Sequence, residues 1–363
     1  MPSLITNTTS PSRPPKAPHV EGPKIKKPMR PAKDLPAFII DEARATKRVP
    51  WDAKQHLAFE PPKSIVTMKD IGLEGHGISP IAVSEPFPLF SKDAMLQMRA
   101  EIFSKPVLDN NRFSSDLIAE VIRGLTPEQA PFCFSAWYSP EVLNIVSKVA
   151  GIELVPCTDY EVANVNISIN DQNIPLQGTD DQVSSVAWHY DSVPFVCVTM
   201  ASDCTGMVGG ETAIKLPNGD VQKVRGPSQV SNGFRKFIGY KVLTSCQGTA
   251  VIMQGRYIYH QALKAFGGRE RIAMITSFRA KSPLVRDESV LTGLRAISNT
   301  SELYSMYTDY RLEMLEERIR IKRKEEVARR KGQRPYDVVQ MRFWLEEQKG
   351  FLESMLEQII EIE

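Results

Sequence analysis

Two histidines and one aspartate have the spacing of a metal site. His189 and Asp191 are two residues apart in a β-rich region, and His260 follows Asp191 by 69 residues. In a strand, residues i and i+2 point to the same side, so this imidazole and this carboxylate can reach one metal ion. Two neutral imidazoles and a carboxylate form the facial ligand set that suits Fe(II) and leave the opposite positions open. The sequence therefore predicts a catalytic metal centre at His189, Asp191 and His260.

An arginine and a threonine are expected beside this centre. Arg271 follows His260 by eleven residues, across a Gly-Gly turn and on the next predicted strand. A neighbouring antiparallel strand brings its guanidinium to the metal pocket, where it can clamp a carboxylate through two parallel hydrogen bonds. Thr212 ends a Gly-Gly-Glu-Thr segment 21 residues after Asp191 and can add a hydroxyl to the same carboxylate.

The region that carries these residues has the periodicity of short β-strands. Residues 161–169 alternate between apolar and polar side chains, as a half-buried strand does. Further β-rich segments of 151–285 are separated by glycine-rich turns. They are 193–200, 211–216, 248–253, 258–263 and 272–278. Many short strands with little helix predict an antiparallel barrel or a double-sheet jelly roll as the core.

Three regions are expected to flank this core. Residues 1–36 hold nine of the 26 prolines and no Phe, Trp or Tyr, so they are predicted to be a disordered, basic tail. Residues 37–150 are predicted to be mostly helical, with Ser91, Ser115 and Ser139 as N-caps. Residues 300–363 have a helical period that is broken at 332–335, which predicts an antiparallel helical hairpin.

Charge, hydropathy and cysteine usage exclude several classes of protein. The 363 residues include 45 basic and 43 acidic side chains, a balance of +2 that does not fit a strongly basic nucleic-acid binder. No stretch reaches the roughly 18 uninterrupted apolar residues of a membrane span, so no membrane partner is expected. Five scattered cysteines without CxxC spacing argue against a disulfide framework or a zinc site and favour a reducing, cytoplasmic location.

In combination, these motifs resemble the Fe(II)/2-oxoglutarate-dependent oxygenases over residues 160–280. Residues 188–195, Trp-His-Tyr-Asp-Ser-Val-Pro-Phe, and the Gly-Gly-Glu-Thr segment are similar to the taurine-dioxygenase branch. The resemblance implies an α+β protein with a double-stranded β-helix core of the jelly-roll or cupin type. It also implies Fe(II) on the three ligands, dioxygen as co-substrate, and the distal carboxylate of 2-oxoglutarate on Arg271 and Thr212.

The co-substrate site departs from the family pattern at one position. Many relatives carry Arg-x-Ser on the last core strand, whereas Ala273 stands at the third position here. Arg271 must then hold the carboxylate with other help, for which Thr212 is the candidate. Asn164 and Asn166 share the polar face of the first core strand and are further candidates to face the co-substrate.

The substrate is expected to be a small molecule with one polar end and an aliphatic reacting end. Ser185 precedes His189 by four residues and can offer its hydroxyl to such a substrate, while Phe343 and Trp344 on the last helix can close the open side as an apolar lid. The outer segments are similar to oxygenases of fungal secondary metabolism, which include an aziridine-forming amino-acid oxygenase. That resemblance implies an amino acid or a secondary-metabolite intermediate as substrate, with hydroxylation, desaturation or ring closure as the outcome.

Two other functions stay open at this point. One is a protein or nucleic-acid hydroxylase or demethylase of the same superfamily. The nucleic-acid repair branch tends to carry a second arginine six residues after the first, and Ser277 stands there, so no nucleic-acid partner is expected. The other is a metal-free β-barrel whose C-terminal helices mediate oligomerisation. A homo-oligomer through these helices is also compatible with the enzyme.

Overall fold

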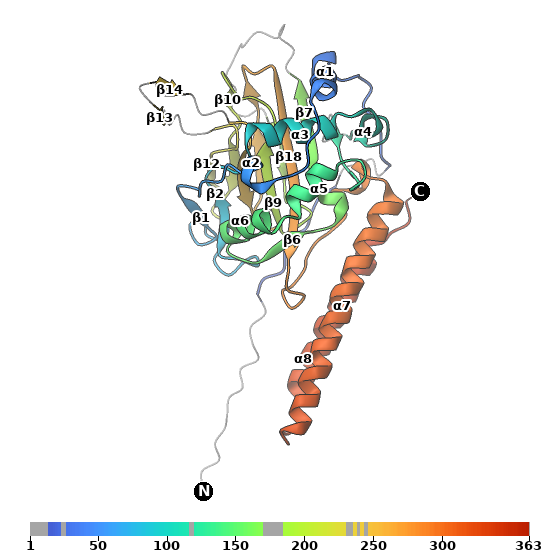
Figure 1. Cartoon of the computed structure of the whole chain (residues 1–363). Helices are drawn as coiled ribbons and strands as arrows, with labels where there is room; N and C mark the ends of the chain where they lie inside the picture. The colour runs from blue at the N-terminus through green and yellow to red at the C-terminus, as the bar shows by residue number, and fades with distance from the viewer. Residues whose placement is uncertain are drawn as a thin grey trace.

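The computed structural model describes residues 14–22, 27–115, 120–169, 184–229, 235–237, 240–242 and 246–362, without side chains for 184–186, 235–237 and 240–242. The chain folds into antiparallel sheets with helices packed against them and a long C-terminal helical hairpin (Figure 1). None of its described helices combines the length and the apolar character that a bilayer crossing requires.

The core strands belong to a large and a small sheet. The large sheet has ten strands, and its main path is β1 (Ile65–Thr67), β2 (Ile81–Ser84), β15 (Thr249–Met253), β9 (Phe195–Met200), β18 (Glu270–Ala280), β7 (Asn164–Ile169), β5 (Val121–Ile122) and β4 (Arg112–Phe113). Off this path, β3 (Phe87–Pro88) pairs with β15 and β6 (Leu154–Pro156) with β18. The small sheet is β12 (Val221–Val224), β11 (Thr212–Lys215), β16 (His260–Leu263) and β8 (Ser184–His189). Two further two-stranded sheets are β10 (Val208–Gly209) with β17 (Ala265–Phe266), and β13 (Arg235–Phe237) with β14 (Tyr240–Val242).

The chain alternates between these two sheets as it advances. It passes from β7 in the large sheet to β8 in the small one, back to β9, then to β11 and β12, and returns through β15, β16 and β18. Most core strands therefore pair with strands distant in sequence, as β18 does with both β7 and β9. Because side chains alternate along each strand, one set from each sheet lines a shared interior.

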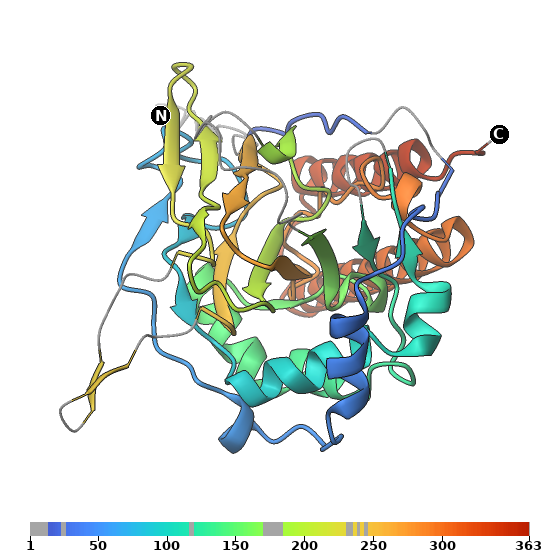
Figure 2. The ribbon, with the colours of Figure 1, turned by 90° about the horizontal axis from the view of Figure 1, so that it is seen from above.

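Helices cover the large sheet on one side (Figure 2). They are α1 (Ala37–Ala45), α2 (Ala53–His56), α3 (Lys92–Ile102), α4 (Lys105–Asn110), α5 (Pro131–Trp137) and α6 (Pro140–Ala150). The predicted caps Ser91 and Ser139 accept hydrogen bonds from the backbone at the starts of α3 and α6. Trp137 is fully buried and packs its ring against Phe90 and Phe278, which fixes the helices to the sheet.

The helix predicted after Ser115 is wrong where the structure describes it. Val121 and Ile122 form β5 and pair with Asn166 and Val165 of β7. Both residues are β-branched and buried, and pairing with the open edge of β7 satisfies their backbone groups. The helical spacing of apolar residues was therefore overridden by a tertiary partner.

Part of the segment expected to be a disordered tail lies along the core. The backbone N–H of Ala17 donates to Glu288 Oε1 (2.7 Å), and Arg256 Nη1 donates to the carbonyl oxygen of Pro18 (2.6 Å). Val20 is buried. These side chains bind the backbone of residues 14–22, an interaction that the segment's own composition does not reveal.

A disulfide joins Cys204 to Cys246, which the scattered cysteine spacing did not predict. Cys204 follows β9 and Cys246 precedes β15, two strands that pair in the large sheet. Their Cα atoms are consequently 5.7 Å apart although 42 residues separate them. Cys133, Cys157 and Cys197 are free and buried.

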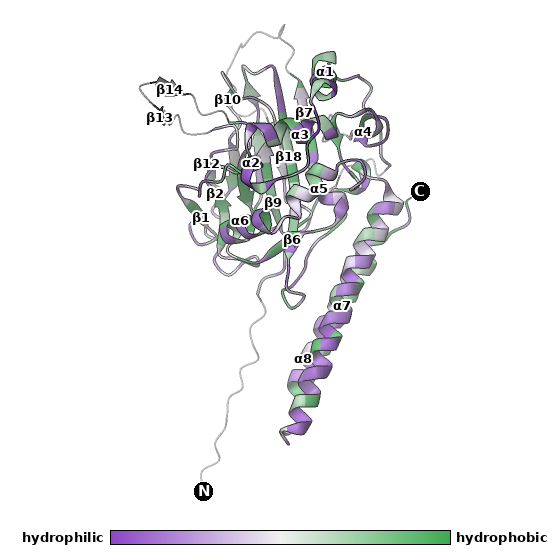
Figure 3. Cartoon of the chain, in the orientation of Figure 1, coloured by the Kyte–Doolittle hydropathy of each residue, from purple (hydrophilic) through white to green (hydrophobic). Residues whose placement is uncertain are grey.

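The C-terminal hairpin consists of α7 (Thr300–Lys331), which follows the short helix η2 (Arg295–Ile297), and α8 (Val338–Gln358). Its base is fixed by Arg311, which is fully buried and lies 3.2 Å from Asp287. Tyr310 of α7 and Phe351 of α8 pack in the same apolar cluster. The rest of the hairpin extends away from the sheets and is largely hydrophilic with isolated apolar positions (Figure 3).

Candidate metal centre

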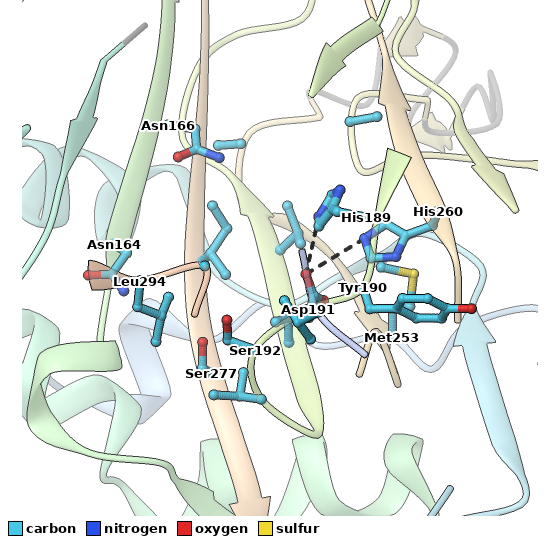
Figure 4. Close-up of a pocket in the computed structure, with 18 of the residues that line it drawn as sticks. Asn164, Asn166, His189, Tyr190, Asp191, Ser192, Met253, His260, Ser277 and Leu294 are labelled. Atoms are coloured by element: carbon cyan, nitrogen blue, oxygen red, sulfur yellow. Dashed lines mark ion pairs between the residues drawn. The ribbon is translucent and has the colours of Figure 1, made fainter. Parts of the chain in front are cut away.

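The structure brings the predicted triad together at the edge of the small sheet. His189 ends β8 and His260 begins β16, and the two residues face each other across the ladder. Asp191 Oδ1 lies 3.3 Å from His189 Nε2 and 3.7 Å from His260 Nε2 (Figure 4). One ligand atom from each residue lies within 4.8 Å of the others, which is a separation that a single metal ion can bridge.

Backbone hydrogen bonds set the tautomer of both imidazoles. His189 Nδ1 is 2.7 Å from the carbonyl oxygen of Ala187, and His260 Nδ1 is 2.9 Å from that of Ile258. A ring nitrogen that faces a carbonyl oxygen must carry the proton, so Nε2 holds the lone pair in the neutral ring. Both lone pairs are therefore directed toward Asp191, as metal-binding histidines require.

The protonation states also suit a metal site. Burial and the neighbouring His189 lower the pKa of His260 to about 4, so His260 is neutral near pH 7. Burial alone would raise the pKa of Asp191 and lower that of His189. The two histidines outweigh burial and lower the pKa of Asp191, whereas Asp191 raises that of His189. Asp191 is thus ionised, as a carboxylate ligand must be.

Asp191 keeps one oxygen without a partner among the described residues. Oδ2 is buried and accepts no hydrogen bond from them. Burying a carboxylate oxygen without compensation costs free energy, and a cation bound to the carboxylate would offset that cost. Oδ1, which faces the histidines, and the two directed Nε2 atoms fit a divalent metal ion.

Gly255 gives the carboxylate its space. The Asp191 N–H donates to the Gly255 carbonyl (3.0 Å), and a Cβ at Gly255 would overlap Asp191 Oδ2. We expect Gly255→Ala to turn the carboxylate away from the histidines and to weaken Fe(II) binding about 10–100-fold, as loss of a ligand-orienting neighbour does. Titration with Fe(II) under nitrogen measures this effect. Gly350→Ala, where a Cβ meets nothing, is the matched control, and equal affinities in the two variants would refute the role of Gly255.

The triad opens into a cavity of about 610 Å³ between the two sheets. The predicted co-substrate residues Arg271, Thr212, Asn164 and Asn166 all line it. A volume of this order is typical of small-molecule sites. The structure therefore places every predicted metal and co-substrate residue around one space.

Arg271 has the environment expected of an anion clamp. Its Nε is buried without a hydrogen-bond partner, and no acidic side chain among the described residues pairs with it. Burial accordingly lowers the pKa of Arg271. Arg99, another buried arginine, is instead paired with Glu42 (2.6 Å) and Glu270 (2.7 Å). A buried guanidinium without a counter-charge is poised to bind an anion.

Cross-strand pairing shows what stands beside the unusual Ala273. In the ladder between β18 and β7, Arg271 pairs with Ser168 and Ala273 pairs with Asn166. Directly paired residues share a face of the sheet, so the Asn166 amide lies next to the position where relatives carry a serine. Asn166 is therefore the best-placed of the two asparagines to assist Arg271.

The two predicted substrate residues have different outcomes. Ser185 lies in β8 beside the centre, but its side chain is outside the described residues. Phe343 and its neighbour Trp344 lie on α8 and do not line the cavity. The hairpin points away from the sheets, and Leu294 and Ile297, before α7, line the cavity instead (Figure 1).

Several lining residues were missed by sequence reasoning. Ser277 is six residues from Arg271, an even step on one strand, so the period of two was an available signal for it. Arg123 follows a segment expected to be helical, and Glu161 opens the segment 161–169 expected to be a strand, so no local signal marks either of them as a lining residue. Residues 19–22 reach the cavity from the segment expected to be a tail.

Comparison with known proteins yields structural matches only: no protein-family model and no curated protein matches the chain. The matching solved structures include oxygenases of the 2-oxoglutarate–Fe(II) type, the class whose motifs the sequence resembles. One is an oxidoreductase of the 2OG-Fe(II) oxygenase family from Burkholderia pseudomallei, with 10% identity over 44% of this chain and 65% of that one, at a TM-score of 0.29. A prolyl-4-hydroxylase from Pseudomonas putida matches with 13% identity over 53% of this chain and 88% of that one, at a TM-score of 0.27.

A third match is the non-haem α-ketoglutarate-dependent epimerase SnoN from nogalamycin biosynthesis, with 12% identity over 47% of this chain and 66% of that one, at a TM-score of 0.29. The chain spans just under two thirds of the Burkholderia protein and of SnoN. At these identities and TM-scores, the geometry of the site itself carries the functional argument.

Proposed function

We propose that the chain is a non-haem Fe(II)/2-oxoglutarate-dependent oxygenase that oxidises an aliphatic C–H bond of a small molecule. The observation that carries this proposal is one cavity lined by both the His189–Asp191–His260 cluster and the unpaired Arg271. The cluster suits Fe(II), and the arginine suits a dicarboxylic co-substrate that reaches the metal with its other end. A metal-free barrel would not require a metal-ligand cluster and an unpaired arginine in one cavity.

We further propose that the two core sheets form a double-stranded β-helix. The interleaved strand order β15-β9-β18-β7 in one sheet and β12-β11-β16-β8 in the other supports this fold. Apart from the consecutive strands β11 and β12, successive passes of the chain alternate between the two sheets, as in a jelly roll. The fold would explain why His189 and His260, far apart in sequence, meet on adjacent strands.

Each residue then has a definite task. His189, Asp191 and His260 would hold Fe(II), and Arg271 with Thr212 would hold the distal carboxylate of 2-oxoglutarate. Bound iron and co-substrate supply, with dioxygen, the oxidising chemistry, while the protein supplies binding and orientation. The apolar side chains of Val196, Val251 and Met253, among others, line the cavity and exclude water from it. Because Asp191 fills the carboxylate position, we do not propose a halogenase, in which that position is left for chloride.

Thr212 makes a smaller contribution that can be measured separately. It lies on β11 opposite Ala262 and lines the cavity. Thr212→Val keeps the shape but removes one hydroxyl, so we expect 2-oxoglutarate binding to weaken by about 1–2 kcal/mol. Calorimetric titration of the metal-loaded protein measures the change. An unchanged affinity would place the hydroxyl outside the co-substrate site.

The proposed substrate is an amino acid or an amino-acid-derived metabolite. A cavity of about 610 Å³ that is lined by residues of both sheets favours a small molecule over a protein or nucleic-acid chain. The test supplies Fe(II), 2-oxoglutarate, air and a panel of free amino acids, and follows products by mass spectrometry. We expect one compound to gain an oxygen atom, or to lose two hydrogen atoms by desaturation or ring closure. Oxidation of peptides or oligonucleotides in place of small molecules would refute this substrate class.

We also propose that the C-terminal hairpin joins two copies of the chain. Val338, Leu345 and Leu352 on α8, and Ile359 at its C-cap, are exposed at intervals of seven residues, the repeat of one seam position in a coiled coil. We expect a dimer or larger species by light scattering and a monomer for Leu345→Glu combined with Leu352→Glu. Leu284→Glu, exposed outside the hairpin, should not change the mass. A monomeric wild-type protein would refute this interface.

A further inference from the structure

A second polar cluster lines the cavity and has no task in the metal or co-substrate site. Arg123 follows β5, Glu161 ends the short helix η1 (Asp159–Glu161), Asn164 begins β7, and Ser277 lies on β18. All four residues are at least 96% buried. Figure 4 shows Asn164 and Ser277 on the wall across from Asp191.

This cluster lies apart from the proposed co-substrate clamp. Arg271 and Ser277 are six residues apart on the extended strand β18, which corresponds to ~20 Å. One small dicarboxylate held by Arg271 cannot extend beyond the triad to Ser277 as well. The cluster is therefore available for a second small molecule, which must be the substrate if Arg271 holds the co-substrate.

Glu161 is saturated by its neighbours. Its Oε1 accepts a hydrogen bond from Arg123 Nη2, while Oε2 accepts from Ser277 Oγ (2.9 Å) and Asn164 Nδ2 (3.3 Å). The ion pair between Arg123 and Glu161 makes the cluster neutral as a whole. A ligand group of net charge would leave its charge uncompensated here, so a neutral or zwitterionic group fits better.

The cluster nevertheless presents one open donor and one open acceptor. Arg123 Nε and Asn164 Oδ1 are buried and have no hydrogen-bond partner among the described residues. Leaving such groups unpaired costs free energy that a bound ligand can recover. The ligand must offer an acceptor to a guanidinium and a donor to an amide oxygen. The carboxylate and the ammonium of an α-amino acid meet both demands.

We infer that Arg123 and Asn164, positioned by Glu161 and Ser277, bind the charged head group of a free α-amino acid whose aliphatic side chain extends toward the triad. The role as substrate rests on the proposed oxygenase function, whereas binding itself does not. Arg123 receives the carboxylate and Asn164 Oδ1 receives the ammonium. The apolar lining between this cluster and the metal, which includes Ile275 and Leu294, accommodates the aliphatic part.

Calorimetric titration under nitrogen, with protein loaded with Fe(II) and 2-oxoglutarate, tests the inference with each free proteinogenic L-amino acid. We expect at least one aliphatic amino acid to bind. Its amine analogue without the carboxylate and its acid analogue without the amino group should each bind about tenfold or more weakly, because each lacks one charge-assisted hydrogen bond. If no amino acid binds, or if the amine and the acid bind as tightly as the amino acid, the inference is overturned.

A charge-balanced pair of variants separates recognition from folding. Arg123→Met with Glu161→Gln keeps the cluster neutral, and we expect it to weaken amino-acid binding at least about tenfold. Arg311→Met with Asp287→Asn removes a buried ion pair outside the cavity and should leave binding unchanged. Asn164→Ala leaves the ion pair intact and should affect the amino acid more than the acid analogue. Equal affinity for the amino acid in wild type and Asn164→Ala, or in wild type and the Arg123 variant, overturns the assignment.

The proposed function can fail independently of this subsite. Succinate formation from 2-oxoglutarate tests the oxygenase without any of these variants. If succinate does not form but Arg123-dependent amino-acid binding is measured, the subsite is supported and the oxygenase proposal is refuted. If succinate forms but no amino acid binds, the oxygenase proposal is supported and the subsite is refuted.

Discussion

Replacing any one of His189, Asp191 and His260 by alanine is expected to reduce 2-oxoglutarate turnover to background. The three ligand atoms lie within 4.8 Å of one another, so each truncation removes one of only three protein ligands. Loss of a neighbour that merely orients a ligand costs about 10–100-fold in affinity or activity, and loss of a ligand should cost more. Iron content after reconstitution and succinate yield are the two readouts.

The folded state should tolerate these substitutions. Asp191 Oδ2 lacks a partner, so Asp191→Ala removes a buried unsatisfied oxygen in the metal-free protein. We therefore expect the metal-free variant to remain folded and to unfold cooperatively on heating. His76→Ala is the matched control, because His76 does not line the cavity and should be dispensable. Near wild-type turnover in His260→Ala would remove the metal hypothesis.

Replacing Arg271 by alanine is expected to weaken 2-oxoglutarate binding by roughly 3–5 kcal/mol, which is several hundredfold or more. The Arg271 Nε is buried, and no acidic side chain among the described residues pairs with the guanidinium, so the alanine variant loses a positive charge that is free to bind the carboxylate. Titration of 2-oxoglutarate into protein loaded with Fe(II) under nitrogen measures the loss. The metal site should be unaffected, so Fe(II) affinity serves as an internal reference.

Arg269 provides a matched arginine two residues away. Its guanidinium lies over the ring of Phe38, and it does not line the cavity. Arg269→Ala should therefore bind 2-oxoglutarate as the wild type does. If Arg271→Ala retains wild-type affinity, another basic residue holds the acid and the assignment of the clamp is wrong.

The core strands could be predicted because their pattern is local. Segments 193–200, 248–253 and 272–278 correspond to β9, β15 and β18, in which apolar and β-branched side chains are concentrated. The spacing of His189 and Asp191 carried similar local information, since His189 ends β8 and Asp191 follows two residues later. In the structure, the ligand atoms of His189 and Asp191 lie close to that of His260.

Features that depend on distant partners could not be predicted. Val121 and Ile122 have a helical context in sequence, and only the open edge of β7 makes them a strand. The disulfide between Cys204 and Cys246 likewise follows from the pairing of β9 with β15. Phe343 was expected at the site from its apolar character, but the direction of the hairpin depends on contacts such as that of Arg311 with Asp287.

Succinate formation from 2-oxoglutarate is the most direct test of the proposed oxygenase. The assay compares wild-type protein with Asp191→Ala, in air and with the amino-acid panel, and omits Fe(II) or 2-oxoglutarate in turn. We expect succinate only when wild-type protein, Fe(II), 2-oxoglutarate and dioxygen are all present, with a higher yield when the substrate is included. Succinate at equal rates from wild type and Asp191→Ala, or none from wild type with the full panel, would contradict it.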